Sequence, residues 1–283
     1  MNTYKTLQSP KVDTDLTEKI IASIDSKKAS VDELKLALSL VDLTTLEGKD
    51  TNQRIIELCK KAIESGTAAV CVYPSLVAVA KNELKNSNKK VASVAGGFPS
   101  GQIPLNIRLQ EAKYAIEQGA DEIDMVISRG KFLEGKYELI HEEVAAFKEV
   151  CKNITLKVIL ETGELETLNN IRIASDIALY AGADFIKTST GKMAINATLP
   201  AICVMLQAIK DYHTTTGKKC GIKPSGGISD WDTAAKYLRL TEQIVGNEWL
   251  NPNLFRFGAS RLVDNLISEI NGIKNTNTTA SGY

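Results

Sequence analysis

Short apolar segments typical of strands alternate with helical patterns along most of the chain, and this alternation constrains the fold most strongly. Apolar residues at three- and four-residue spacing between these segments indicate amphipathic helices. Gly66, Gly119 and Gly182 stand where such helices commonly end. The eight expected strands are Leu38–Leu43, Ala69–Tyr73, Val91–Ala95, Glu122–Val126, Thr155–Leu160, Asp184–Lys187, Cys220–Lys223 and Phe255–Gly258.

Eight strand–helix units in a chain of 283 residues predict one α/β domain, an eight-stranded parallel (β/α)8 TIM barrel. An open doubly wound sheet is the alternative, but no Gly-x-Gly-x-x-Gly motif follows a strand. Residues 1–33 are expected to form an N-terminal helical extension over the bottom of the barrel. In it, Asp13–Ser26 has an amphipathic pattern, and Ser30 with Glu33 has the form of a capping box. The polar residues 275–283 are expected to form a flexible C-terminal tail.

The composition argues against several classes of partner. The formal net charge is zero, so nothing suggests a nucleic acid. No apolar run is long enough to span a membrane, and the first residues lack the apolar core of a signal peptide. Five scattered cysteines favour a reducing cytoplasm over a disulfide framework. With two histidines and no Cys-x-x-Cys motif, a zinc site is not expected.

Two lysines end neighbouring strands of the predicted barrel. The spacing of Lys187 and Lys223 fits one strand–helix–strand crossover, which places them on adjacent parallel strands. Two ammonium groups about 5 Å apart repel by about 3 kcal/mol at an effective dielectric of about 20, or about two pKa units. One lysine should therefore lose its proton near neutral pH, and a neutral amine attacks carbonyl carbons. The pair predicts Schiff-base chemistry, although either lysine alone is more often a salt-bridge or phosphate ligand.

Other strands carry further candidate residues near their carboxyl ends. Side chains alternate along a strand, so Lys157 shares a face with Glu161. A buried lysine needs a carboxylate, and we predict a contact between Lys157 and Asp124. Asp124 is as readily a structural ion-pair member as an acid–base group, and Asp42 could simply cap the following loop. The small apolar neighbours of Cys71 favour an inert core thiol over a reactive one.

Glycine-rich loops follow the last three expected strands. Barrels often bind phosphate at this position, because glycine lets the backbone approach an anion and helix-start N–H groups favour negative charge. Three such loops in succession favour a phosphate site over tight turns alone. The residues concerned are Thr190, Gly191, Lys192, Gly226, Gly227, Gly258 and Ser260.

Six segments together resemble the deoxyribose-phosphate aldolase family. They are Asp42–Leu46, Cys71–Pro74, Leu156–Leu165, Gly182–Lys192, Lys223–Gly227 and Arg256–Ser260. The segments occur in order and at suitable spacing, from about residue 34 to the end of the chain. The resemblance implies a cofactor-free class I aldolase on an eight-stranded barrel. Such an enzyme reversibly cleaves 2-deoxy-D-ribose 5-phosphate to D-glyceraldehyde 3-phosphate and acetaldehyde.

The same resemblance implies roles for individual residues. Lys187 is the expected Schiff-base lysine, and Lys223 is the neighbour that lowers its pKa. Asp124 is the expected proton-relay carboxylate, working with Lys223 and a water, and Tyr283 is expected to move the methyl proton of the enamine. Gly191, Lys192, Gly226, Gly227, Gly258 and Ser260 match phosphate-binding positions. Further expected substrate contacts are Asp42, Thr44, Cys71, Lys157 and Thr190.

One position departs from the family, and two other functions stay open. Position 261 is arginine where many members have a second serine, so its backbone N–H and positive charge are expected to substitute. The alternatives are another Schiff-base sugar-phosphate aldolase or transaldolase, and a catalytically silent phosphate-binding barrel. Intact Lys187, Lys223 and Asp124 argue against the silent barrel. We expect sugar phosphates and aldehydes as partners, no nucleic acid or membrane, a cytoplasmic location and a homodimer.

Overall fold

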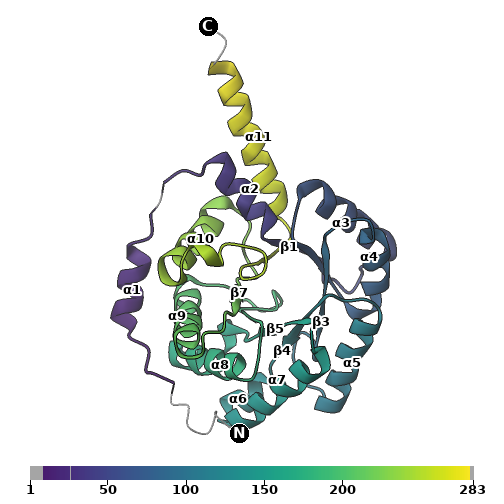
Figure 1. Ribbon diagram of the computed structural model, residues 1–283, viewed down its shortest axis with the longest axis vertical. Helices are drawn as coiled ribbons and strands as arrows, with labels where there is room; N and C mark the ends of the chain where they lie inside the picture. Colours follow the sequence, from purple (N-terminus) through teal and green to yellow (C-terminus); the bar gives the residue numbers. More distant parts are fainter. Residues whose placement is uncertain (1–8, 26, 281–283) are drawn as a thin grey trace.

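The computed structural model describes residues 9–25 and 27–280, with side chains through residue 272 (Figure 1). Its centre is an eight-stranded sheet of parallel strands surrounded by helices, which confirms the predicted barrel. The strands are β1 (Val41–Thr44), β2 (Ala69–Val72), β3 (Lys90–Ala95), β4 (Glu122–Val126), β5 (Thr155–Ile159), β6 (Phe185–Lys187), β7 (Gly221–Lys223) and β8 (Phe257–Ala259).

The strands follow one another around the barrel in chain order. Each of β1 to β7 pairs with the next, and β1 also pairs with β8. Two isolated bridges, from Ile222 to Phe255 and from Ser225 to Gly258, join the segments around β7 and β8 and nearly close the barrel. All strands therefore end at the same rim, where the loops that lead into the helices collect.

Helices cover the outer face of the barrel between successive strands (Figure 1). They are α3 (Asn52–Ser65), α4 (Val77–Leu84), α5 (Leu105–Glu117), α6 (Arg129–Leu133), α7 (Tyr137–Cys151), α8 (Leu168–Tyr180), α9 (Leu199–Thr216), α10 (Trp231–Val245) and α11 (Leu262–Ala280). Short 3-10 turns occur at Pro74–Leu76, Thr162–Glu164 and Asn247–Trp249. Among the described residues, none of the helices has the length and apolar character that crossing a membrane requires.

The first strand begins later than predicted. Leu38 and Leu40 were expected in it, but Leu38 ends up in the last turn of α2 (Val31–Ser39), and β1 starts at Val41. The predicted capping box explains the helix: the Glu33 N–H donates to Ser30 Oγ at 3.2 Å, and the Ser30 N–H donates to Glu33 Oε2 at 2.7 Å. The apolar residues at 34, 37 and 38 then lie on one buried helical face.

The placement of the N-terminal helices over the bottom of the barrel was wrong for α1 (Thr14–Ala22). This helix lies outside the helical ring and packs against α9, while α2 packs against α11 (Figure 1). The apolar residues Ile20 and Ile21 of α1 pack against the core on the side of α9. The guanidinium of Arg239 on α10 donates to the carbonyls of Asp25 (2.6 Å) and Lys27 (2.8 Å), which holds the following segment on the helices as well.

The C-terminal segment also differs from the expected tail. The backbone of α11 stays helical through Ala280, and Figure 1 shows this helix projecting away from the barrel. Residues 275–280 therefore continue a helix instead of forming an irregular tail. Tyr283 lies outside the described residues, so its placement over the barrel mouth stays a prediction.

Alternation along the strands sends apolar and charged side chains to opposite faces. On β4, Ile123 and Met125 belong to the apolar core between barrel and helices, whereas Glu122 and Asp124 point the other way, toward the barrel axis. Phe185 fills part of this interior beside Gly221. A Cβ atom at Gly221 would lie only 2.4 Å from the Phe185 ring, so the close approach of the two strands requires glycine there.

Candidate active site

The register of the strands brings the predicted charged residues together inside the barrel. Asp124 of β4 stands opposite Lys157 of β5, and Lys187 of β6 stands opposite Lys223 of β7. Because paired residues of parallel strands point the same way, all four side chains meet near the barrel axis. The predicted adjacency of the two lysines is confirmed. The predicted contact between Asp124 and Lys157 is confirmed too, with Oδ1 and Nζ 2.9 Å apart.

Asp124 is the centre of this cluster. Its Oδ2 accepts hydrogen bonds from Lys187 Nζ and Lys223 Nζ, each at 2.7 Å, while its Oδ1 faces Lys157. The carboxylate is completely buried, and its exposed fraction is 0%. Burial alone would raise the pKa of Asp124, but the three lysines outweigh it and hold that pKa well below its usual range. The lowered pKa favours the carboxylate form of Asp124, which contacts all three lysines.

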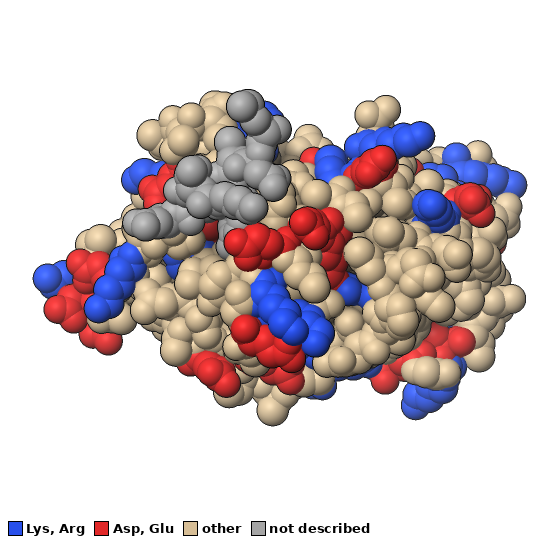
Figure 2. All heavy atoms as spheres, turned by 90° about the horizontal axis from the view of Figure 1, so that it is seen from below, with Lys and Arg blue, Asp and Glu red and all other residues tan. Residues whose placement is uncertain are grey.

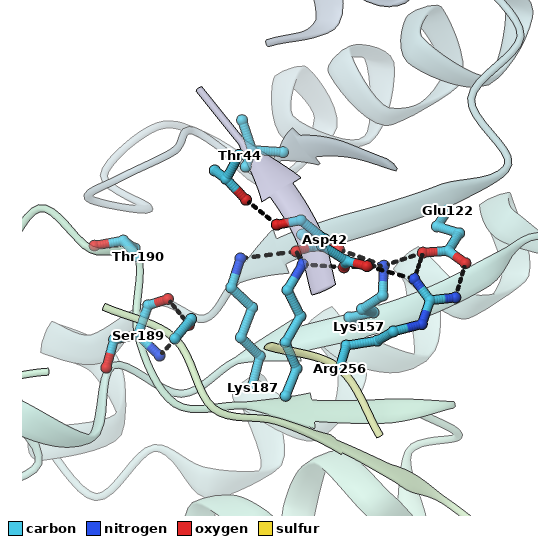
Figure 3. Close-up of polar contacts among 12 residues, drawn as sticks. Asp42, Thr44, Glu122, Lys157, Lys187, Ser189, Thr190 and Arg256 are labelled. Atoms are coloured by element: carbon cyan, nitrogen blue, oxygen red, sulfur yellow. Dashed lines mark hydrogen bonds and ion pairs between the residues drawn. The ribbon is translucent and has the colours of Figure 1, made fainter. Parts of the chain in front are cut away.

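Two residues that the sequence interpretation did not assign complete the cluster. Arg256, just before β8, pairs with Asp42 Oδ1 and donates from Nη2 to Glu122 Oε1 at 2.8 Å. Glu122 Oε2 lies 2.5 Å from Lys157 Nζ. Figure 3 shows these partners side by side at the level of Asp42. The signal for Glu122 was its position two residues before Asp124, which puts both on the inward face of β4.

Asp42, expected to contact the substrate, lies within the charged cluster. Its Oδ2 lies 2.5 Å from Lys223 Nζ, and its other oxygen binds Arg256. The side chain is fully buried. Burial would raise the pKa of Asp42, yet Arg256 and Lys223 keep it below the usual range. Asp42 acts on the site through Lys223, and it does not border the cavity described below.

The charges of the cluster do not balance when every group is ionised. The cations Lys157, Lys187, Lys223 and Arg256 face the carboxylates of Asp42, Glu122 and Asp124, and all seven are buried. One positive charge is therefore in excess in a region shielded from water, where an uncompensated charge is costly. Loss of one lysine proton removes this excess.

The environment shifts the pKa values of Lys187 and Lys223 in opposite directions. Burial lowers the pKa of Lys187, and the attraction of Asp124 offsets this only in part while Lys223 lowers it further. Burial also acts on Lys223, but there the carboxylates of Asp124 and Asp42 outweigh it and raise its pKa. Lys187 is thus the lysine that loses its proton more readily. The predicted repulsion by Lys223 contributes, but burial is the larger cause.

A cavity of about 340 Å³ opens above the cluster at the loop end of the barrel. Lys187 is the one member of the charged cluster that lines it; Lys157, Lys223 and Asp42 lie below. Thr44 of β1 also lines the wall. The rest of the wall includes the glycine-rich loops, with every residue expected to bind phosphate: Thr190, Gly191, Lys192, Gly226, Gly227, Gly258, Ser260 and Arg261.

The loop after β7 requires glycine for two separate reasons. Gly226 and Gly227 have φ angles of 81° and 75°, in the left-handed region that other residues rarely adopt. A Cβ atom on Gly226 would also lie 2.3 Å from Asn196 Oδ1. The chain therefore exposes backbone instead of side chain at this part of the wall. Such a loop leaves room for an anion close to backbone N–H groups.

Glu161, two residues after β5, fixes the neighbouring loop. Its Oε2 accepts the Thr190 hydroxyl at 2.5 Å and the Thr190 N–H at 3.2 Å, while the Lys192 N–H donates to Thr190 Oγ1 at 3.1 Å. Glu161 is fully buried and has a φ of 57°, an uncommon conformation for a residue other than glycine. The Thr190 hydroxyl, expected to contact substrate, is thus engaged in holding the loop that carries Lys192.

Cys71 fits the description of an inert core thiol. It is fully buried and packs with Leu46, Ala92 and Val94 in a small apolar cluster. Burial raises the pKa of its thiol, which disfavours the reactive thiolate. Cys71 does not line the cavity. Within the described part of the chain, no three His, Cys, Asp or Glu side chains are grouped as a metal site would need.

Comparison with protein-family models matches residues 36–241 to the DeoC/LacD family aldolases. The chain belongs to the DeoC/LacD aldolase family. The matched range contains Asp42, Asp124, Lys157, Lys187 and Lys223, and it ends before Arg256 and the last glycine loop.

Curated relatives and solved structures agree with this family. Deoxyribose-phosphate aldolase of Homo sapiens is 47% identical over 252 residues, covering 83% of this chain and 79% of that protein. Deoxyribose-phosphate aldolase of Agrobacterium fabrum is 46% identical and covers 88% of this chain and 95% of that protein. The tetrameric deoxyribose phosphate aldolase of Aeropyrum pernix superposes with a TM-score of 0.67 at 25% identity, covering 92% of this chain and 98% of that one.

Proposed function

We propose that this DeoC/LacD family aldolase is a class I deoxyribose-phosphate aldolase with Lys187 as its Schiff-base residue. It cleaves 2-deoxy-D-ribose 5-phosphate reversibly to D-glyceraldehyde 3-phosphate and acetaldehyde. The observation that carries the proposal is the position of Lys187. This lysine has a lowered pKa, lies at the floor of the cavity beside Asp124 and Lys223, and faces a wall of glycine-rich loops.

The reaction begins with attack on the substrate aldehyde. The neutral Lys187 amine adds to C1 of the open-chain sugar, and loss of water gives a protonated imine. This imine is the electron sink for breaking the bond between C2 and C3. The C3 hydroxyl loses its proton as the bond breaks and becomes the aldehyde of glyceraldehyde 3-phosphate, while the electron pair enters the enamine left on Lys187.

Asp124 and Lys223 transfer the proton that leaves the C3 hydroxyl. Asp124 alone is a weak base, because its pKa lies well below the usual range beside three lysines. A relay through a water molecule, with Lys223 exchanging protons across its 2.7 Å contact to Asp124, suits this environment better. Protonation of the enamine at its methyl carbon and hydrolysis then release acetaldehyde. We assign the methyl proton step to Tyr283, on the family resemblance.

The phosphate of the substrate is held at the far end of the cavity from the imine. The loops carrying Gly191, Gly226, Gly227 and Gly258 supply backbone, and Lys192 supplies charge. Ser260 and Arg261 add a hydroxyl and a second cation at the start of α11. Anchoring the substrate there converts remote binding energy into alignment of C1 with Lys187.

Replacing Lys192 with alanine should raise the KM for 2-deoxyribose 5-phosphate about 10- to 100-fold. The change removes a charge-assisted contact to phosphate, which is worth about 1.5–3 kcal/mol. The KM for unphosphorylated 2-deoxyribose should change far less. Both constants are measured from acetaldehyde release, with the exposed Lys236→Ala on α10 as the matched control. Equal losses for the two sugars would place the phosphate elsewhere, and a wild-type protein that releases no acetaldehyde would refute the proposed activity.

We further propose a homodimer in the cytoplasm. All five cysteines are free and buried, as suits a reducing compartment. Ile103, just before α5, and Leu105 and Ile107, in its first turn, are exposed apolar side chains. In Figure 2 the right side of the molecule, the side of α5 in Figure 1, has a broad area with few charged side chains. A face with few charges and exposed apolar side chains supports contact with a second copy.

A further inference from the structure

An ion pair spans the phosphate end of the cavity. Lys192 Nζ lies 2.9 Å from Glu47 Oε1, although the two residues are 145 positions apart in the chain. Glu47 belongs to the loop between β1 and α3, and Lys192 to the loop between β6 and α9. Both line the cavity, and both side chains are solvent-accessible, at 52% for Glu47 and 29% for Lys192. Glu47 therefore holds the ammonium group of Lys192, which the proposed function assigns to binding phosphate.

Asp50 holds the backbone at Glu47 in place. The Glu47 N–H donates to Asp50 Oδ2 at 2.9 Å, and the Thr45 hydroxyl donates to the same carboxylate. Arg54 Nε holds the other oxygen of Asp50 at 3.0 Å. Asp50 is thus fully engaged within its own loop, and its side chain is only 1% exposed. This leaves Glu47 as the carboxylate that reaches across to Lys192.

The remaining charges around this end of the cavity are positive. Arg54 and Arg261 line it together with Lys192, and Glu47 is the one acidic residue among the described side chains that line it. A phosphate entering here meets Arg261, Arg54, which Asp50 already holds, and Lys192, which Glu47 holds. Because an ammonium held by Glu47 is partly neutralised, the phosphate must separate the ion pair or accept a weaker contact.

We propose that Glu47 is a displaceable counterion of Lys192 that sets how strongly the site selects phosphorylated over unphosphorylated substrates. In the free enzyme its carboxylate holds Lys192, and on binding the phosphate takes its place. The inference rests on the proposed function, since it takes Lys192 as a phosphate ligand. Both side chains are partly exposed, so the exchange needs only rotation about side-chain bonds.

The test is Glu47→Gln, with the ratio of the two KM values as readout. Glutamine keeps the shape and removes the charge. The KM for 2-deoxyribose 5-phosphate should fall about three- to tenfold relative to that for 2-deoxyribose, as expected for a partly exposed pair. The gain should shrink as salt is raised, because these charges are screened. Glu64→Gln is the matched control, since it removes an exposed carboxylate at the far end of α3. The inference would be overturned if, in Glu47→Gln, the KM for 2-deoxyribose 5-phosphate divided by the KM for 2-deoxyribose stayed unchanged or rose.

Combining Glu47→Gln with Lys192→Ala shows whether Glu47 acts by holding Lys192 or by repelling the phosphate directly. If Glu47 acts by occupying Lys192, Glu47→Gln should gain less than twofold when Lys192 is already alanine. The same gain in both backgrounds would mean that Glu47 repels phosphate without holding Lys192, and would overturn the counterion role. The proposed function fails separately, through Lys192→Ala. If that variant loses selectivity for phosphate while Glu47→Gln changes nothing, only the inference about Glu47 is refuted.

Discussion

Replacing Lys223 with methionine is expected to move the acidic limb of the kcat/KM profile to higher pH and to lower activity at neutral pH. Lys187 reacts as a neutral amine, so activity rises as pH passes its pKa. Removing Lys223 removes a positive charge that lowers this pKa and frees Asp124 to stabilise the Lys187 ammonium. Repulsion of about 3 kcal/mol, as between two ammonium groups about 5 Å apart, corresponds to a loss of activity of about 100-fold at neutral pH.

Activity of this variant should recover in part at alkaline pH, where Lys187 loses its proton without help. Incomplete recovery would reflect the proposed second role of Lys223 in proton relay. The control is Lys218→Met, which removes an exposed lysine from the loop between α9 and β7. Its profile should match that of the wild type. A Lys223→Met profile with its limb at the wild-type position would show that the two lysines are not electrostatically coupled.

Replacing Asp124 with asparagine should cause the largest combined loss. The three buried lysines would lose their shared carboxylate, and breaking a buried ion pair in this way costs about 3–5 kcal/mol of folding stability. The proton relay would also be removed, with a fall in kcat of about 100-fold or more. Urea unfolding and steady-state kinetics measure the two effects. Asp264→Asn, which breaks an exposed pair with Lys61, should cost less than about 1 kcal/mol.

The pKa of Lys187 should move in opposite directions in the two variants. Asp124 raises this pKa, so Asp124→Asn lowers it and shifts the acidic limb of imine formation downward. Lys223→Met shifts it upward. Trapping rates with acetaldehyde and borohydride across pH follow this limb even where turnover is lost. Shifts of the same sign would contradict the arrangement of charges around Asp124.

The barrel and the centre of the site could be predicted because both depend on local periodicity. Alternation along a strand fixes which side chains point inward, and parallel neighbours bring inward residues at matching positions together. The contact of Lys157 with Asp124 follows from this alternation, and the adjacency of Lys187 and Lys223 follows from their spacing of one strand–helix–strand unit; their roles came from the family resemblance. The glycine loops were also predictable, since their position after a strand and their residue types are both visible in the sequence.

The parts that were missed depend on contacts between distant segments. Arg256 meets Glu122 across 134 positions and Asp42 across 214, and no local pattern announces either pair. For the same reason, the sequence could not show that Asp42 joins Asp124 in raising the pKa of Lys223. The start of β1 was misplaced because a short apolar run is ambiguous between the end of a helix and a strand.

The position of α1 was missed for a related reason. An amphipathic pattern shows that one face of a helix is buried, but it does not show which neighbour buries it. Residues 14–22 pack against α9 instead of the barrel bottom. The carbonyls that accept hydrogen bonds from Arg239 belong to Asp25 and Lys27, more than 200 positions away along the chain.

The central claim is that Lys187 forms the Schiff base, and trapping its product tests this most directly. The protein is incubated with acetaldehyde and sodium borohydride, digested, and mapped by mass spectrometry. Reduction of the imine should leave an ethyl group on the peptide that contains Lys187, and Lys187→Arg should carry none. An ethyl group on Lys223 instead of Lys187, or full activity in Lys187→Arg, would contradict the account.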